Sequence, residues 1–327
     1  MEFTRFTTVW TVAALAAGST LVQAATPASS DYPSRPLRLI TGFLPGGISD
    51  TLARVVGEKL AERLGQRVII DGRPGAGGMI GLEIAASATP DGYTLLLGTP
   101  AVTISPNFKR KLAFDPMRSF AAVTMLGSSP TIAVVHPSVA ANSIRELIAL
   151  AKSVPGQINY ASSGVGTTNY LAGELFKIMA GVQITAVSYK GAALTLLATI
   201  SGETQLTFSP ILPAIPHVKS GKLKGLAVTG AKRSNALPDM PAIAETLPGY
   251  DVTSWYGILV PAKTPQAIIT RLNSEINQVL AMPDVRERLS SQGVEIVGSS
   301  PAELAAFIKT DAARWAKLVK DAGIHLE

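Results

Sequence analysis

The chain has 327 residues, of which 47% are hydrophobic and 16% charged, so it holds enough apolar material for one or two packed cores. Cysteine is absent, which excludes disulfides, thiolate nucleophiles and cysteine-based metal sites. The formal net charge is +6, but the basic residues are scattered and 109–111 is the one tight cluster, so we expect no nucleic-acid partner.

The first residues are typical of an export signal. Arg5 marks a short positive region, an apolar segment covers 9–22, and small residues follow it. We therefore expect residues 1–25 to be a signal peptide cleaved near Ala24 or Ala25, and the mature protein to be periplasmic. An uncleaved amphipathic tail is the alternative. No later segment has the ~18 consecutive apolar residues of a membrane-spanning helix.

Strands and helices alternate along the first part of the chain, which predicts an α/β fold with parallel sheets. The predicted helix that starts near Asp50 has one apolar face, and Gly65 ends it as a C-cap. Two apolar runs then flank 127–130, and we interpret them as a crossing between lobes. The predicted strands are 37–41, 68–70, 93–97, 121–126 and 131–135, and the predicted helices are 50–64 and 78–87.

The second part repeats the alternation. Prolines exclude a regular element from 231–250, and the strand 255–260 then returns to the first lobe. Three helices end the chain, with start signals at 264–265 and 300–303. The other predicted strands are 159–161, 184–187, 206–208 and 223–229, and the other predicted helices are 143–153, 167–180, 192–200 and one near Ile215.

This pattern divides the mature chain into two lobes. The first comprises 32–127 plus 254–327, and the second comprises 128–253. The fold class is α/β, with two Rossmann-like lobes.

Two loops, 42–50 and 162–169, each follow a strand and precede a helix. The free backbone N–H groups of such a turn, together with the positive end of the helix dipole, form an anion site. Three or four charge-assisted hydrogen bonds of roughly 1.5–3 kcal/mol each are sufficient for the ~8 kcal/mol of a micromolar carboxylate ligand. Asp50 is interpreted as a first-turn residue that complements the dipole, because a bare carboxylate would repel an acid.

Signatures of catalysis are missing from the sequence. The three histidines lie apart, without HExxH spacing, and neither a GxSxG elbow nor a P-loop occurs. The glycines of 72–78 fail the dinucleotide pattern GxGxxG, because Ile80 stands at the third glycine position. We expect no catalytic residue, no metal and no cofactor.

The chain resembles the Bug-type, TctC-like periplasmic receptors of tripartite tricarboxylate transporters from about Tyr32 to its end. Several ordered segments carry the resemblance, and each alone is weak. They are Tyr32-Pro-Ser-Arg-Pro36, Gly42-Phe-Leu-Pro-Gly-Gly-Ile-Ser-Asp50, Arg73-Pro-Gly-Ala-Gly-Gly78, Pro90-Asp-Gly-Tyr-Thr-Leu-Leu-Leu-Gly98, Tyr160-Ala-Ser-Ser-Gly-Val-Gly-Thr167, Leu171-Ala-Gly-Glu-Leu-Phe176, Tyr189-Lys-Gly191 and Leu226-Ala-Val-Thr229.

The resemblance implies a type II periplasmic-binding-protein fold, with a ligand cleft between two lobes that are joined by two crossing segments. It also implies that both strand-to-helix loops hold a carboxylate, while Thr99 and Ser209 contact the distal part of the ligand. The implied loop residues are Phe43, Pro45, Gly46, Gly47, Ile48 and Ser49 in one lobe, and Ser163, Gly164, Gly166, Thr167, Thr168 and Asn169 in the other.

Family members often carry an acidic or amide residue where Ser209 stands, which disfavours an amino-acid ligand here and favours an aliphatic or aromatic mono- or dicarboxylate. We expect a monomeric, non-catalytic receptor that delivers this ligand to the membrane permease subunits of such a transporter. Two alternatives stay open: a periplasmic enzyme that acts on organic acids, and an accessory protein that presents its ligand to a membrane sensor kinase.

Overall fold

The structure, a computed structural model, describes Met1 and residues 32–43, 45–107, 112–189 and 191–321. The predicted signal peptide beyond Met1 and the basic cluster at 109–111 lie outside the described residues. Within the described part, no helix is long and apolar enough to span a membrane.

Within the described residues, ten strands between residues 37 and 296 form one sheet, in the order β2-β1-β3-β9-β4-β7-β5-β6, with β8 and β10 also paired to β4. The sequence predicted parallel sheets, but the sheet is mixed because β4 and β9 run antiparallel to their neighbours. The strands are β1 (Leu37–Thr41), β2 (Val68–Gly72), β3 (Thr94–Gly98), β4 (Phe120–Val135), β5 (Ile158–Ser162), β6 (Ile184–Ser188), β7 (Leu206–Pro210), β8 (Lys224–Val228), β9 (Thr253–Pro261) and β10 (Glu295–Ile296).

Strand β4 is one continuous strand of 16 residues, where the sequence predicted two strands separated by 127–130. Those middle residues pair with β9, from Gly127 opposite Tyr256 to Pro130 opposite Thr253. Gly127 allows β10 to approach, because a Cβ there would lie 2.5 Å from the carbonyl oxygen of Glu295. The glycine therefore serves a close strand contact and does not mark a turn.

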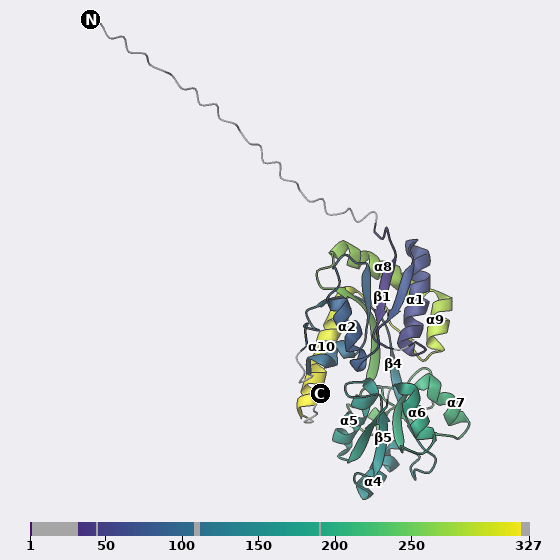
Figure 1. Ribbon diagram of the computed structural model, residues 1–327. Coiled ribbons are helices and arrows are strands. Elements are labelled where there is room, and N and C mark those ends of the chain that lie inside the picture. Colours follow the sequence, from purple (N-terminus) through teal and green to yellow (C-terminus); the bar gives the residue numbers. More distant parts are fainter. Residues whose placement is uncertain (2–31, 44, 108–111, 190, 322–327) are drawn as a thin grey trace. The chain divides into compact units, whose positions relative to one another are not determined.

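The helices gather in two groups that β4 and β9 connect, which gives the predicted two-lobed α/β fold (Figure 1). One group surrounds β1, β2 and β3, and the other surrounds β5 and its neighbours. The first group is α1 (Ile48–Leu64), α2 (Met79–Ala86), α3 (Ala101–Ile104), α8 (Gln266–Ala281), α9 (Pro283–Ser290) and α10 (Pro301–Asp321), and the second is α4 (Ile144–Ser153), α5 (Thr168–Ala180), α6 (Ala192–Ile200) and α7 (Ile211–Lys219).

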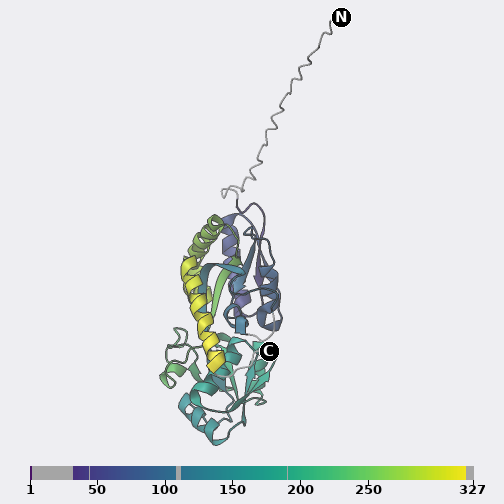
Figure 2. The same ribbon diagram turned by 90° about the vertical axis from the view of Figure 1, so that its left-hand side faces the viewer.

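Helix α10 belongs to the cores of both lobes. Leu304 near its start belongs to the buried cluster that includes Ile40 and Trp255, whereas Trp315 belongs to the buried cluster of the other lobe, which includes Tyr160. Figure 2 shows this long helix running from one group of elements to the other. It is thus a third connection, added to the two crossing segments that the resemblance implied.

The helix caps predicted from the sequence are present, except that helix α8 starts one residue later than predicted. Ser143 Oγ accepts the N–H of Glu146 at 3.2 Å, and Ser300 with Glu303 forms the reciprocal capping box at the start of α10. Gly65 ends α1 in the left-handed region, with φ 66°. Helix α8 starts at Gln266 with Pro265 as N-cap, one residue later than predicted, because Thr264 turns its hydroxyl to the carbonyl of Pro261.

Candidate functional site

The predicted ligand-binding residues lie at or near the carboxyl ends of parallel strands. Strand β1 is parallel to β2 and β3, and β5 is parallel to β6 and β7. The carboxyl ends of such strands share one edge, and ligands of open α/β sheets bind there. The loops after β1 and β3 therefore share an edge of one lobe, and those after β5, β6 and β7 share an edge of the other.

The loop between β1 and α1 presents an uncapped helix start. Gly47 is the N-cap with φ −89° and ψ 174°, and no side chain caps the first N–H groups of α1. Pro45, Gly46 and Gly47 are exposed, Phe43 and Ile48 are half-buried, and Ser49 is buried. A Cβ built on Gly46 or Gly47 would meet nothing within 4 Å. The N–H groups at the start of a helix attract anions, and open space lies beside these glycines.

Asp50 lies in the first turn of α1, as predicted, and it also holds the loop through hydrogen bonds that the sequence did not predict. Its Oδ2 accepts the N–H of Gly46 at 3.1 Å, and both carboxylate oxygens lie 3.0 Å from Arg54 Nε. Burial by itself would raise the pKa of Asp50, but the hydrogen bonds from Arg54 and Gly46 outweigh it and lower the pKa below its ordinary value. The carboxylate thus stays charged and takes one N–H of the loop, which leaves the helix start for another anion.

The loop between β5 and α5 has the same form. Thr167 is the N-cap in extended conformation, and its side chain does not cap α5. Gly164 and Gly166 have φ of 109° and 79°, a region that favours glycine. Ser163, Gly164, Thr167 and Thr168 are half-buried, and Gly166 is buried. In both predicted loops the N-cap residue, Gly47 or Thr167, therefore leaves the helix start uncapped by its own side chain, and in α5 the third N–H, of Tyr170, is taken by Asn169.

Asn169 holds the second loop together. Its Oδ1 accepts the N–H of Ser163 at 3.2 Å and that of Tyr170 at 3.0 Å, and its Nδ2 donates to Ser163 Oγ at 2.9 Å. Thr167 Oγ1 also lies 2.6 Å from the same Oδ1. The buried amide thus fixes the loop conformation, and its predicted contact with a ligand stays a prediction.

The two residues predicted to contact the distal part of a ligand are both buried. Thr99 directly follows β3 and is 4% exposed, and Ser209 in β7 is 0% exposed. The hydroxyl of Ser209 donates to the carbonyl of Pro210 at 3.1 Å. Both lie at the carboxyl ends of their strands. In this structure their side chains are too buried for a ligand to reach, so their predicted contact with the ligand stays a prediction.

The structure brings in two further parts that the sequence reasoning missed. The segment 75–78 lies between the two loops, since a Cβ on Gly78 would be 3.3 Å from Phe43 Cζ and one on Gly77 would be 3.9 Å from the carbonyl oxygen of Val165. Ser254 Oγ in β9 lies 3.1 Å from Thr168 Oγ1. The glycines of 72–78, which failed the dinucleotide pattern, were the sequence signal for the first of these parts. Ser254 lies one residue before the predicted strand 255–260, and nothing in the sequence singled it out.

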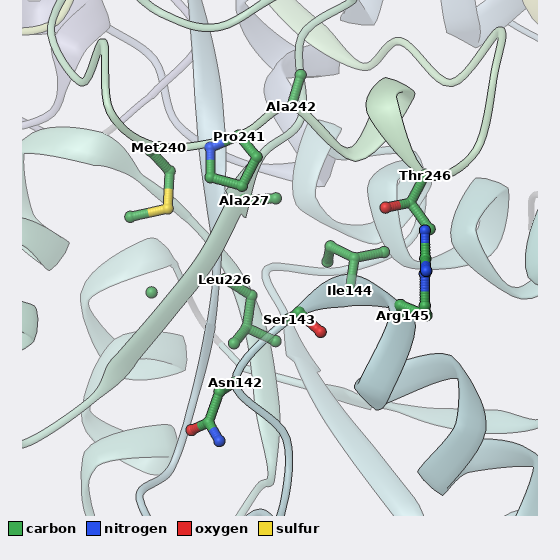
Figure 3. Close-up of a pocket in the computed structure, with 11 residues that line it drawn as sticks. Asn142, Ser143, Ile144, Arg145, Leu226, Ala227, Met240, Pro241, Ala242 and Thr246 are labelled. Carbon is green, nitrogen blue, oxygen red and sulfur yellow. The ribbon is translucent and has the colours of Figure 1, made fainter.

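A separate hollow lies in the second lobe, away from these loops (Figure 3). It is lined by residues of α4, β8 and 240–246, and none of the predicted ligand-binding residues lines it. Among the described residues, no cluster of His, Asp and Glu side chains could hold a metal ion.

Comparison with known proteins identifies the family. The model of the tripartite tricarboxylate transporter family receptor matches residues 52–324. The chain belongs to this family. It is 32% identical over 307 residues to the protein BugT of Bordetella pertussis, covering 93% of this chain and 94% of BugT.

Solved structures agree with the fold. The R. palustris protein Rpa4515, solved with adipate, has a TM-score of 0.84 and 36% identity, covering 90% of this receptor and 99% of that chain. MatC of Rhodopseudomonas palustris, solved with bound malate, has a TM-score of 0.78 and 29% identity, covering 88% and 100%. The two-lobed type II binding-protein fold and the membership in the Bug and TctC group are thereby confirmed. As a member of this family, the protein is a solute receptor.

Proposed function

We propose that this receptor captures a small carboxylate between its two lobes. The observation that carries the proposal is the pair of helices, α1 and α5, that start at the two loops with first N–H groups that their N-cap residues, Gly47 and Thr167, do not cap. Each start offers N–H groups and a positive dipole end to an anion. The adipate and malate of the two Rhodopseudomonas palustris structures support an aliphatic dicarboxylate as the first candidate.

The proposed ligand contacts are those of the two loops. Gly47, Ile48 and Ser49 would offer backbone N–H groups from α1, and Thr167 and Thr168 would add hydroxyls from α5. The lobe that holds the first loop would comprise 32–127 and 254–327, and the other 128–253. Closure about β4 and β9 would bury the ligand and strengthen its hydrogen bonds.

We further propose that the protein is exported, acts in the periplasm as a monomer, and hands its ligand unchanged to the permease subunits of a tripartite tricarboxylate transporter. The family description supports the permease, and the lack of a nucleophile–base pair in the sequence supports a role without catalysis.

A thermal-shift screen of the mature protein tests the ligand class. Adipate, malate, glutarate and benzoate would be compared with adipamide, a neutral control of the same length as adipate. A ligand at 100 times its Kd stabilises the folded state by about 2.7 kcal/mol. We expect at least one acid to raise the Tm and adipamide to leave it unchanged. A Tm raised by sugars or cations, and by no acid, would contradict the proposal.

A further inference from the structure

The hollow in the second lobe has a volume of about 440 Å³ and opens beside strand β8 (Figure 3). One wall is β8 itself, from Gly225 to Ala227. A second wall is the segment 240–242, and a third is the start of α4, where Ser143 and Arg145 lie. The hollow is therefore a slot between a strand and two flanking segments.

Strand β8 is an edge strand of the sheet. Its inner edge pairs with β4 from Lys224 to Val228. On its outer edge, the pairing within the described part of the chain is a single bridge between Val228 and Ala242, with the N–H of Val228 donating to the carbonyl of Pro241 at 2.8 Å. Edge strands with free N–H and C=O groups are templates for an added strand.

Pro241 explains why this chain does not complete the ladder itself. Proline has no N–H to donate, and the backbone turns directly afterwards into the short 3₁₀ helix Ile243–Glu245. The segment thus touches β8 at one residue and then leaves it. The rest of the outer edge, from Gly225 to Ala227, lines the hollow.

Met240 packs over one face of β8. A Cβ on Gly225 would lie 3.0 Å from the terminal methyl of Met240, so that methyl rests over the strand. Methionine is unbranched and flexible, and it adapts to different occupants of a binding surface.

The charges around the slot favour an acidic occupant. Arg145 is exposed, lines the slot, and forms no ion pair or hydrogen bond with the described residues. Lys224 Nζ lies 3.3 Å from Asn142 Oδ1 at the same rim. Glu146 and the exposed Asp239 keep their negative charge nearby, and Glu245 pairs with Arg233, but none of these carboxylates lines the slot, so Arg145 is the charged side chain that an occupant meets first.

We propose that this slot binds one extended, acidic segment of a partner protein, which adds as a strand along Lys224–Ala227. Backbone hydrogen bonds would give affinity, and Arg145 would select acidic side chains. A second folded copy of the chain fits less well. Its strand would carry neighbouring strands at about 4.8 Å spacing into the walls formed by α4 and 240–242. This surface is separate from the proposed carboxylate site.

Two synthetic peptides test the proposal on the mature protein. One is a blocked, fluorescein-labelled heptapeptide of alternating valine and glutamate, and the other has lysine in place of glutamate. We expect the acidic peptide to bind at least tenfold more tightly in fluorescence anisotropy. It should also slow hydrogen exchange at least tenfold at an amide within 225–227. Equal binding of the two peptides, or unchanged exchange there, would overturn the proposal.

A matched pair of variants on α4 locates the contact. Arg145→Glu should weaken binding of the acidic peptide at least tenfold. Lys152→Glu, an equal charge reversal at the exposed far end of the same helix, should change it less than twofold. Equal effects of the two variants would mean that the peptide is attracted by the overall positive charge of the protein, and would contradict binding in the slot.

Two further results would also contradict it. A peptide N-methylated at alternate residues loses its backbone donors, and binding as tight as that of the parent would exclude strand addition. Protection of 225–227 without peptide, together with a dimer in analytical ultracentrifugation, would mean that a second copy occupies the edge.

Discussion

Asp311 Oδ2 accepts a hydrogen bond from Trp255 Nε1 at 3.1 Å, which ties the buried carboxylate of α10 to the returning strand β9. The same oxygen accepts from Thr103 Oγ1 at 2.6 Å, and Oδ1 accepts from Arg314 Nη2 at 2.8 Å. Arg314 in turn donates to Asp251. This carboxylate, 4% exposed, therefore joins three residues of the first proposed lobe, and Arg314 extends the network to Asp251 of the second.

Asp311→Ala should lower the free energy of unfolding by about 2–4 kcal/mol, because the buried Trp255 N–H loses its acceptor and Arg314 loses an ion-pair partner, while Thr103 keeps the carbonyl of Pro100. Asp311→Asn keeps an acceptor and should cost less. Lys309→Ala, at an exposed position of the same helix, should change stability by no more than about 0.5 kcal/mol. Urea unfolding of the three variants checks this order; equal losses for alanine and asparagine would refute the role of the acceptor.

Gly47→Val should raise the Kd for the carboxylate at least tenfold while leaving the Tm of the free protein unchanged. Its φ of −89° suits any residue, and a Cβ there meets open space, so the new side chain fills the proposed site without strain. Gly46→Val is the contrasting variant. Its φ of +90° makes a side chain cost about 1–2 kcal/mol of stability. Calorimetric titration and a melting curve distinguish the two; unchanged affinity in Gly47→Val would remove this loop from the site.

Gly173→Ala should destabilise the protein by about 1–3 kcal/mol. Replacing glycine with alanine inside a helix usually increases stability, so this result would be the reverse of the usual effect. A Cβ at Gly173 would lie 2.3 Å from the Tyr160 ring, which is buried in the core of the second lobe. Gly57→Ala in α1 is the comparison, because its Cβ would meet side-chain atoms no nearer than the flexible end of Ile70 at 3.0 Å and Val68 Cγ1 at 3.3 Å. Denaturant unfolding should show the larger loss for Gly173→Ala.

Glu245 should titrate with a midpoint of about 2. The hydrogen bonds from Arg233 and from the N–H of Ala242 lower its pKa from 4.5 to about 2. Because the folded-state pKa is depressed, any stability that this carboxylate adds is present above about pH 4.5 and is lost as the pH falls towards 2. An NMR titration of the side-chain carboxyl measures the midpoint, and Arg233→Ala should move it upwards. A midpoint unaffected by that substitution would contradict the pairing.

Local patterns were sufficient to predict most elements. Apolar periodicity and caps such as Gly65 and the Ser300–Glu303 box act over a few residues, so the sequence specifies them directly. The continuity of β4 could not be predicted in this way. Gly127 and Pro130 are typical of a turn, and the pairing with β9, more than 120 residues away, overrides that local preference.

The two loops show the same division. Glycine, proline and hydroxyl residues between a strand and a helix determined that 42–50 and 162–169 are strand-to-helix turns, because turn chemistry is local. The tertiary structure decided which groups of those turns are already engaged. It placed Asp50 on the N–H of Gly46 and buried the Asn169 amide inside its own loop.

The sequence by itself determined the α/β class, the two strand-to-helix loops and, through its ordered motifs, the receptor family. Only the tertiary structure decided that α10 connects both cores, that Ser254 lies beside Thr168, and that β8 keeps an open edge. These features join residues tens to hundreds of positions apart. Periodicity along the chain cannot specify such contacts, because they arise when separately formed elements pack together.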